Sequence, residues 1–252
     1  MPACACRFGD RVPAFLDYAD SVGLRTRRFG NERLFVLVAL GAASALCLAL
    51  ELVRERRYGA LDYRFLVWNL ILAWIPLLLG LLIYDRYRRG TRLARLVPAA
   101  ALWLLFLPNA PYIVTDFVHL SSARVPPLWL DGIELSAFAW TGMLLGFVSL
   151  YLVHAVVRHR FGAQAGWLGV LGVLVLVSAG VYLGRVKRWN SWDLLTQPGS
   201  RLAQLHARLD DPLSLGRAFG VTLGLTVLLT LAYLVFYMLV GARFEPQQSR
   251  GD

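Results

Sequence analysis

WLLFLPNAPYIVTDFVHL, the stretch from Trp103 to Leu120, begins as an apolar run, breaks at two prolines and then resumes with polar side chains. Pro108 lacks an N–H group and clashes with the preceding turn, so a helix that arrives there must kink or stop. Pro111 fits the first turn of a new helix. Its N-cap would be Asn109 or Ala110, and asparagine is the better capping residue. The stretch therefore predicts a helix that is broken between the two prolines.

Polar side chains follow this break at helical spacing. Tyr112, Thr115, Asp116 and His119 stand at positions i, i+3, i+4 and i+7, which lie on one face of an α-helix. Apolar residues cover the rest of the helix. Since the stripe combines a phenol, a hydroxyl, a carboxylate and an imidazole, we expect it to face something polar.

The composition of the chain indicates a membrane protein. Hydrophobic residues make up 58% of the 252 residues and charged residues only 17%, whereas a soluble domain is about half apolar and about a quarter charged. The apolar residues also form blocks long enough to cross a bilayer as helices. We therefore predict an all-α, polytopic transmembrane helix bundle of about six spans. The expected spans are Leu34–Val53, Phe65–Tyr84, Leu93–Leu107 continuing kinked to Leu120, Leu130–Val157, Gly166–Gly184 and Arg217–Val240.

Three regions are expected along the chain. Residues 1–33 form a polar, arginine-rich N-terminal tail, residues 34–240 the transmembrane helical domain, and residues 241–252 a polar C-terminal tail. Within the membrane domain, small residues recur at four-residue spacing, a pattern typical of close helix–helix packing. They are Gly142 and Gly146, followed by Ser149, in one span and Gly180 and Gly184 in another.

The formal net charge of +10 comes almost entirely from arginine. In a membrane protein such charge reports topology and contact with anionic lipid rather than nucleic-acid binding. Segments that would lie on the same side as both termini hold 15 of the 26 lysine and arginine residues. The positive-inside tendency therefore favours a multi-pass protein of the plasma membrane with both termini in the cytoplasm.

This topology collects polar residues at one membrane level on the extracytoplasmic side. Polar groups at membrane depth are costly unless they are paired or face a cavity, so we expect a shared polar pocket. Its predicted members are Asn69, Asn109, Asn190, Arg64, Asp116, His119, Asp131, Glu134, Arg185, Arg188 and Asp193.

The run Tyr182–Asp193, YLGRVKRWNSWD, places three cations directly after a span on this side, where the positive-inside tendency does not explain them. Two alternatives remain open for Arg185 and Arg188. They could bind phosphate, or they could pair with an acidic residue such as Asp116. The tryptophans of the run suit the membrane interface.

A metal site has little support in the sequence. Asp116 and His119 would supply only two ligands at i and i+3, and a metal ion needs three or four. Asp131 and Glu134 could complete such a set, but their place after a proline pair favours a helix cap with a first-turn acid. The cysteine pattern also supports neither a zinc site nor a disulfide framework. No metal and no cofactor are therefore expected.

Four separated runs resemble the bacterial membrane proteins grouped as domain of unknown function 1361. They are NLILAWIP (Asn69–Pro76), FLPNAPYIVTDFVHL (Phe106–Leu120), LSAFAWTGMLLGFVSLYLVH (Leu135–His154) and YLGRVKRWNSWDLL (Tyr182–Leu195). The resemblance implies a polytopic bacterial membrane protein without an established activity. It carries over no catalytic residue.

Three classes of function follow from these patterns, and whether the chain is an enzyme stays open. The first is an enzyme or binding protein for an anionic, lipid-linked substrate, with the lipid bilayer as its surroundings. The second is a transporter with a discontinuous third helix, and the third is a non-catalytic scaffold or assembly protein. The first class takes Asp116 and His119 as a candidate acid/base pair, and Asn69, Asn109, Tyr112, Arg185, Arg188, Trp189 and Asn190 as candidate substrate-binding residues.

Overall fold

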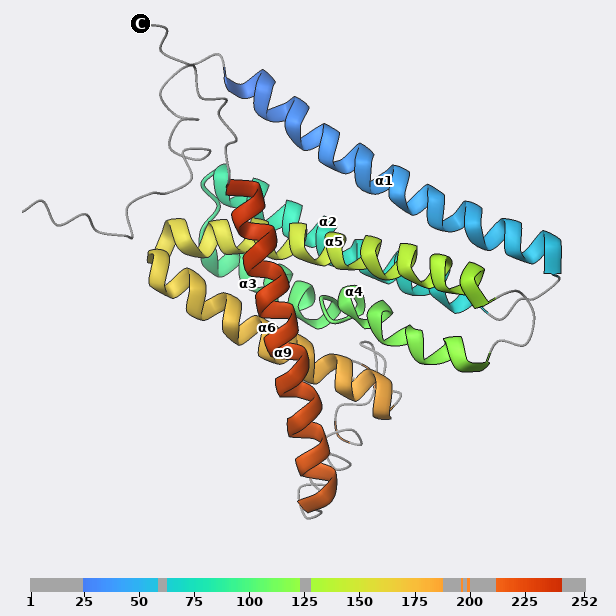
Figure 1. The fold of residues 1–252 in the computed structure, drawn as a ribbon. Helices are drawn as coiled ribbons and strands as arrows, with labels where there is room; N and C mark the ends of the chain where they lie inside the picture. The colour runs from blue at the N-terminus through green and yellow to red at the C-terminus, as the bar shows by residue number, and fades with distance from the viewer. Residues whose placement is uncertain are drawn as a thin grey trace, which may run out of the picture.

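The computed structural model describes residues 25–58, 63–122, 128–187, 196, 199 and 212–241. The elements in these ranges are all helical. They are α1 (Arg25–Tyr58), α2 (Arg64–Arg88), α3 (Leu93–Phe106), α4 (Asn109–Tyr112), the 3₁₀ helix η1 (Ile113–Ser122), α5 (Leu128–Phe161), α6 (Ala163–Lys187) and α9 (Pro212–Gly241) (Figure 1).

Six stretches of these helices are long and apolar enough to cross a membrane. The third of them runs from Leu93 to Phe117 and includes the break, as predicted. The all-α fold, the six spans and the interrupted third span are thereby confirmed. α1 begins at Arg25, so the end of the predicted polar tail is part of the first helix. The rest of that tail and the C-terminal residues 242–252 lie outside the described ranges.

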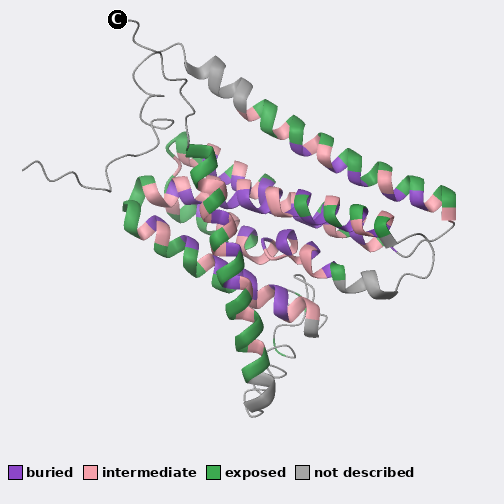
Figure 2. Cartoon of the chain, in the orientation of Figure 1, coloured by how far each residue is buried: buried purple, intermediate pink, exposed green. Residues whose placement is uncertain are grey.

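Helices α2 and α5 form the centre of the bundle, with α1 on one side and α3, α4 and α6 on the other (Figure 1). α1 and α9 lie at the periphery, and most of their surface is exposed (Figure 2). Their exposed residues are largely leucine, valine and phenylalanine. Such a surface suits lipid, because acyl chains solvate apolar side chains as well as a protein interior does.

One serine joins three of the central helices. Ser149 of α5 donates a hydrogen bond of 2.6 Å to the carbonyl oxygen of Pro76 in α2. It accepts one of 2.7 Å from the indole Nε1 of Trp103 in α3. The close approach is possible because Gly80 of α2 faces this serine without a side chain. The hydroxyl of Ser149 and the indole N–H of Trp103 are thus both hydrogen-bonded inside an apolar layer, where an unpaired polar group would be costly.

An aromatic cluster attaches α9 to the bundle at the far end of α5. Nδ1 of His154 lies 3.0 Å from the hydroxyl of Tyr233, and the rings of Trp167 and Tyr237 pack around them. This histidine is buried and remote from the polar residues at the start of α5. It therefore holds helices together and does not join the candidate site.

Candidate functional site

The interruption of the third span lies at Pro108, between the end of α3 and the start of α4. Proline has no N–H group to continue the helical ladder. Two residues further on, the amide of Ala110 bonds the carbonyl of Leu107 at 3.1 Å, three residues back instead of four. The backbone therefore tightens at this point, and the carbonyl oxygen of Phe106 loses its usual helical partner.

Asn109 supplies the missing donor. Its Nδ2 group lies 2.9 Å from the oxygen of Phe106, so the side chain satisfies the end of α3. The prediction that Asn109 or Ala110 caps the new helix is wrong, because Pro108 stands in the N-cap position and no side-chain cap bond is made. The physical reason is that Leu107 and Pro108 keep helical backbone angles, so α4 follows α3 closely.

The segment that carries the polar stripe is a 3₁₀ helix, Ile113–Ser122. In this helix each residue advances about 120°, compared with about 100° in an α-helix. Tyr112 and Thr115 therefore share one side of the segment, whereas Asp116 lies about 120° away from Thr115. The prediction of one α-helical face is wrong in this respect.

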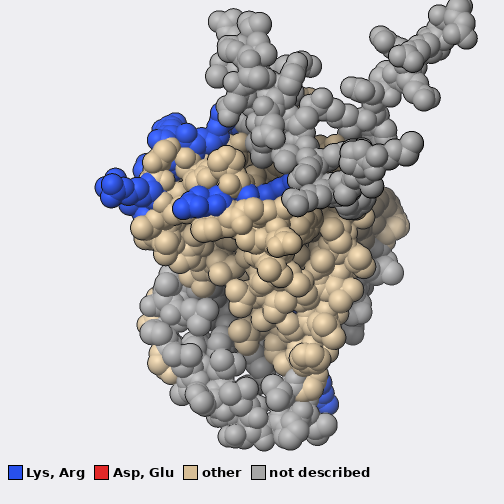
Figure 3. All heavy atoms as spheres, turned by 90° about the vertical axis from the view of Figure 1, so that its left-hand side faces the viewer, with Lys and Arg blue, Asp and Glu red and all other residues tan. Residues whose placement is uncertain are grey.

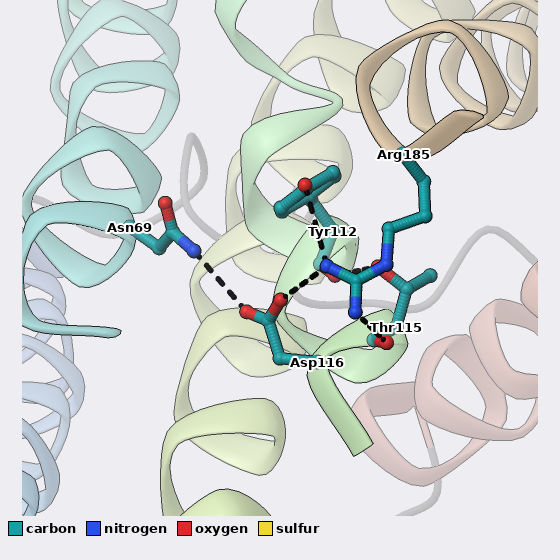
Figure 4. Close-up of polar contacts among 5 residues, drawn as sticks. All are labelled: Asn69, Tyr112, Thr115, Asp116 and Arg185. Carbon is teal, nitrogen blue, oxygen red and sulfur yellow. Dashed lines mark hydrogen bonds and ion pairs between the residues drawn. The ribbon is translucent and has the colours of Figure 1, made fainter. Parts of the chain in front are cut away.

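Arg185, near the end of α6, brings three of these residues to one point (Figure 4). Its Nη1 lies 2.8 Å from Oδ1 of Asp116 and 3.5 Å from the hydroxyl of Tyr112. Its Nη2 donates to the backbone oxygen of Thr115 at 2.8 Å. The guanidinium carbon also lies 5.7 Å from the centroid of the Tyr112 ring. Of the two alternatives for Arg185, the geometry shows an ion pair with Asp116.

Asn69 of α2 approaches the same carboxylate from the opposite side (Figure 4). Its Nδ2 donates to Oδ2 of Asp116 at 3.1 Å. The Asp116 side chain is 1% exposed, whereas that of Arg185 is 23% exposed. Both carboxylate oxygens thus have a protein donor, and α2, η1 and α6 are tied together by one buried charge. A carboxylate held in this way is placed to orient the guanidinium of Arg185.

Other predicted members of the site fall outside the residues whose side chains are described. The backbone of His119 belongs to η1, but its imidazole is not described. Arg188, Trp189, Asn190 and Asp193 lie outside the described residues, in the segment that follows α6. The acid/base role of His119 and the binding roles of these residues therefore stay predictions.

Asp131 and Glu134 belong to a separate polar cluster. Oδ1 of Asp131 lies 3.0 Å from Nε of Arg54, and Oε2 of Glu134 lies 3.6 Å from the same atom. Asp131 stands in the first turn of α5, as predicted for a helix-start acid, but its side chain is completely buried. The two acids pair with α1 instead of joining Asp116. In the described residues no group of three or more His, Cys, Asp or Glu is placed to hold a metal ion.

Sequence reasoning missed Arg54 and Glu51 as partners of these acids. The first span was expected to end at Val53, which assigned Arg54 to a loop, whereas α1 continues to Tyr58. A signal was present, because the buried residues of α1 recur at alternating spacings of four and three, as in the seam of a coiled coil. They are Leu40, Ser44, Cys47, Glu51 and Arg54.

Glycines of the neighbouring helices hold the broken segment in place. A Cβ atom on Gly142 of α5 would lie 2.7 Å from the backbone oxygen of Ala110, and one on Gly146 would lie 2.9 Å from the Ala110 side chain. A Cβ atom on Gly180 of α6 would lie 2.7 Å from Cγ of Pro108. The predicted packing role of the small residues is confirmed at these positions. The break is therefore sealed by protein, as irregular backbone at membrane depth requires.

The comparisons with known proteins agree with the resemblance in the sequence. A search of curated proteins and a search of solved structures find no match. A family model described as "Protein of unknown function (DUF1361)" matches residues 68–238, which include α2 from Trp68, the break, α5, α6 and most of α9. Since this match covers more than half of the sequence, the chain belongs to the DUF1361 family.

Proposed function

We propose that the protein is a plasma-membrane protein that binds the phosphate group of an anionic, lipid-linked substrate on its extracytoplasmic side. The observation that carries this proposal is the setting of Arg185. Its guanidinium is anchored by Asp116 and by the backbone of Thr115, yet it stays partly exposed at the last residue of a membrane-spanning stretch. At that depth the phosphate groups of lipids lie, and arginine is well suited to bind them.

The donor count of the guanidinium supports this assignment. Arginine has five N–H groups, and the contacts within the described residues use both groups of Nη1 and one of Nη2. Within the described residues, the Nε–H and the second Nη2–H have no acceptor, so we assign them to a ligand. Asp116 holds the cation in one orientation and is itself nearly unexposed, so an anion would approach Arg185 from its exposed side. Lys187 and Arg188, which follow in the sequence, would add positive charge nearby.

We infer the orientation of the bundle in the membrane from the positive charge at the end that lies away from Arg185. Exposed arginines gather around the link between α2 and α3 and at the end of α5 (Figure 3). They are Arg86, Arg88, Arg89, Arg92, Arg95 and Arg160. Positive residues favour the cytoplasmic side. This end would therefore face the cytoplasm, and Arg185 would face outward.

The binding test compares Arg185→Gln with a charge-matched control. Arg64→Gln removes an exposed arginine at the same end of the bundle, where Arg64 pairs with Glu55. Each full-length protein is reconstituted in phosphatidylcholine nanodiscs, and binding of short-chain phosphatidic acid, diacylglycerol and inorganic phosphate is measured. Loss of a hydrogen bond to a charged group costs about 1.5–3 kcal/mol, so Arg185→Gln should weaken phosphatidic acid binding about tenfold or more.

The control separates this site from a general effect of surface charge. Arg64→Gln should change the affinity by less than about twofold, because exposed charges contribute little. Binding of phosphatidic acid but not of diacylglycerol would show that the phosphate is recognised, and competition by inorganic phosphate would show that the lipid tail is dispensable. Equal affinities for Arg185→Gln and the wild type would refute the proposal.

A non-catalytic scaffold is the second candidate, and the burial of Asp116 favours it. Asp116 joins two helices through Asn69 and Arg185, and fixing the positions of these helices could be its sole role. In that case Asp116→Asn and Arg185→Gln would lower the stability of the protein without any change in lipid affinity. The transporter alternative gains less support, because Ala110 in the broken segment is completely buried and packed against two glycines of α5.

A further inference from the structure

The contact between α1 and α5 contains more negative than positive charge. The buried face of α1 carries charged residues near the C-terminal end of the helix, where Glu51 is 5% and Arg54 2% exposed. On α5 it is met by Asp131 and Glu134, which are 0% and 1% exposed. Among the described residues, three carboxyl groups thus share one guanidinium in a buried interface. If all were ionised, two negative charges would have no counter-charge, and burying such charges is costly.

Arg54 is already committed to one side of this cluster. Its Nε donates to Asp131 at 3.0 Å and lies 3.6 Å from Glu134, and its guanidinium carbon is 3.9 Å from the centroid of the Tyr63 ring. The carboxyl group of Glu51 lies beside that of Glu134. Both oxygens of Glu51 are buried and have no hydrogen-bond partner in the described part of the protein. Among the described residues, Glu51 is therefore the acid of this cluster that forms no ion pair.

Two kinds of ligand can neutralise adjacent buried carboxylates, a cation or a proton. The described residues contain no group of acids arranged to hold a metal ion, and Arg54 already provides a fixed positive charge beside Asp131 and Glu134. A proton needs no coordination shell, and it allows two carboxyl groups that lie side by side to form one hydrogen bond. One proton on this pair lowers the uncompensated negative charge of the cluster from two to one, and the side-by-side geometry favours a proton over a metal ion.

We propose that Glu51 and Glu134 form a proton-binding site between α1 and α5, in which one proton is shared by the two carboxyl groups at neutral pH. In the described residues the charged and titratable groups around it come from α1, α5 and the residue that precedes α2. They are Cys47, Glu51, Arg54, Asp131, Glu134 and Tyr63, with the pair Glu55 and Arg64 at the exposed rim. Deprotonation would place two like charges across the helix contact and weaken the docking of α1. The proposal is independent of ligand binding at Arg185.

Infrared difference spectroscopy of the full-length protein in lipid nanodiscs tests this site. The wild type should show the C=O stretch of a protonated carboxyl group at neutral pH, shifted in D₂O and lost reversibly at alkaline pH. Glu51→Gln and Glu134→Gln should each remove the band, because the remaining glutamate can then ionise next to the new amide donor. Glu55→Gln is the matched control, since Glu55 is on the same helix but partly exposed and paired with Arg64, and it should keep the band.

Conservative variants show whether a lost band reflects loss of the carboxyl group or loss of folding. Glu51→Asp and Glu134→Asp retain a protonatable group on a shorter side chain, so each should keep a band at a shifted frequency. Absence of the band from the wild type at neutral pH would overturn the proposal, and this result needs no variant. A band that persists in both glutamine variants, or that sodium or a divalent chelator abolishes, would overturn it as well.

Discussion

Substitution of Gly180 by alanine should destabilise the bundle through a single methyl group. The new Cβ would stand 2.7 Å from Cγ and 3.0 Å from Cβ of Pro108. Real Cβ contacts are wider than this, and the proline ring is a rigid obstacle that cannot rotate away. α6 must therefore move off the broken segment, or the break must shift, and either change disturbs a densely packed interior.

The size of the effect follows from a matched position on the same helix. Gly172 also lies within α6, but a Cβ atom there would meet nothing within 4 Å. Both substitutions gain the same helix propensity, up to about 1 kcal/mol in favour of alanine. Their difference therefore isolates the overpacking cost, which is about 1–3 kcal/mol for an extra methyl group in a filled core. That difference corresponds to a change of about five- to 150-fold in the unfolding equilibrium.

The assay is unfolding of the purified full-length variants in mild detergent with increasing sodium dodecyl sulfate, followed by circular dichroism. Gly180→Ala should unfold at a lower fraction of dodecyl sulfate than the wild type, and Gly172→Ala at the same fraction or a higher one. Gly180→Ala as stable as Gly172→Ala would refute the claim that this glycine admits Pro108 between the helices. Gly142→Ala provides a repeat, because its Cβ would meet the backbone oxygen of Ala110 at 2.7 Å.

Three further predictions concern the contacts of α5. Ser149→Ala leaves the indole N–H of Trp103 without its acceptor, so the unfolding free energy should fall by about 1–3 kcal/mol, and an unchanged midpoint in the same assay would contradict this. Thr141→Cys, in a background where the two tail cysteines are serine, should form a disulfide with Cys47, since the present Sγ and Oγ1 atoms are 3.5 Å apart. Failure to form that bond under mild oxidation, judged by mass spectrometry, would show that α1 docks in a different register. Arg54→Met removes the guanidinium that pairs with Asp131 and Glu134 in the buried cluster and should cost about 3–5 kcal/mol, so membrane accumulation equal to the wild type would disprove its role.

The sequence predicted the membrane architecture because its signals are local. Six apolar blocks and two nearby prolines are sufficient to place the spans and the break, and the structure has both. It also predicted that Asp116, Asn69 and Arg185 share one membrane level, where the structure joins them by hydrogen bonds. Residues of different spans can be assigned to the same membrane level from the sequence, because each spanning helix crosses the bilayer from one side to the other. This assignment does not depend on which helices are neighbours.

Lateral arrangement is the part that the sequence did not predict. Asp131 was grouped with Asp116 on the basis of depth alone, but it faces α1 and pairs with Arg54. The assignment of Arg54 to a loop rested on where the apolar run ends, and helices extend beyond such runs when a neighbour neutralises their charges. The 3₁₀ conformation of η1 was also not predicted, because i+3 and i+4 spacings suit an α-helix equally well.

The break at Pro108 and the hydrogen bonds of Asp116 depend on each other. A 3₁₀ helix rises about 2.0 Å per residue, compared with about 1.5 Å in an α-helix, so residues 113–122 extend further along the bundle than an unbroken helix of the same length. This extension carries Asp116 to the level at which Asn69 of α2 and Arg185 of α6 both reach it. Straightening the third span by Pro108→Ala should therefore do more than repair a helix. It would draw the carboxylate away from its two donors, so the protein should lose stability even though alanine is the better helix former.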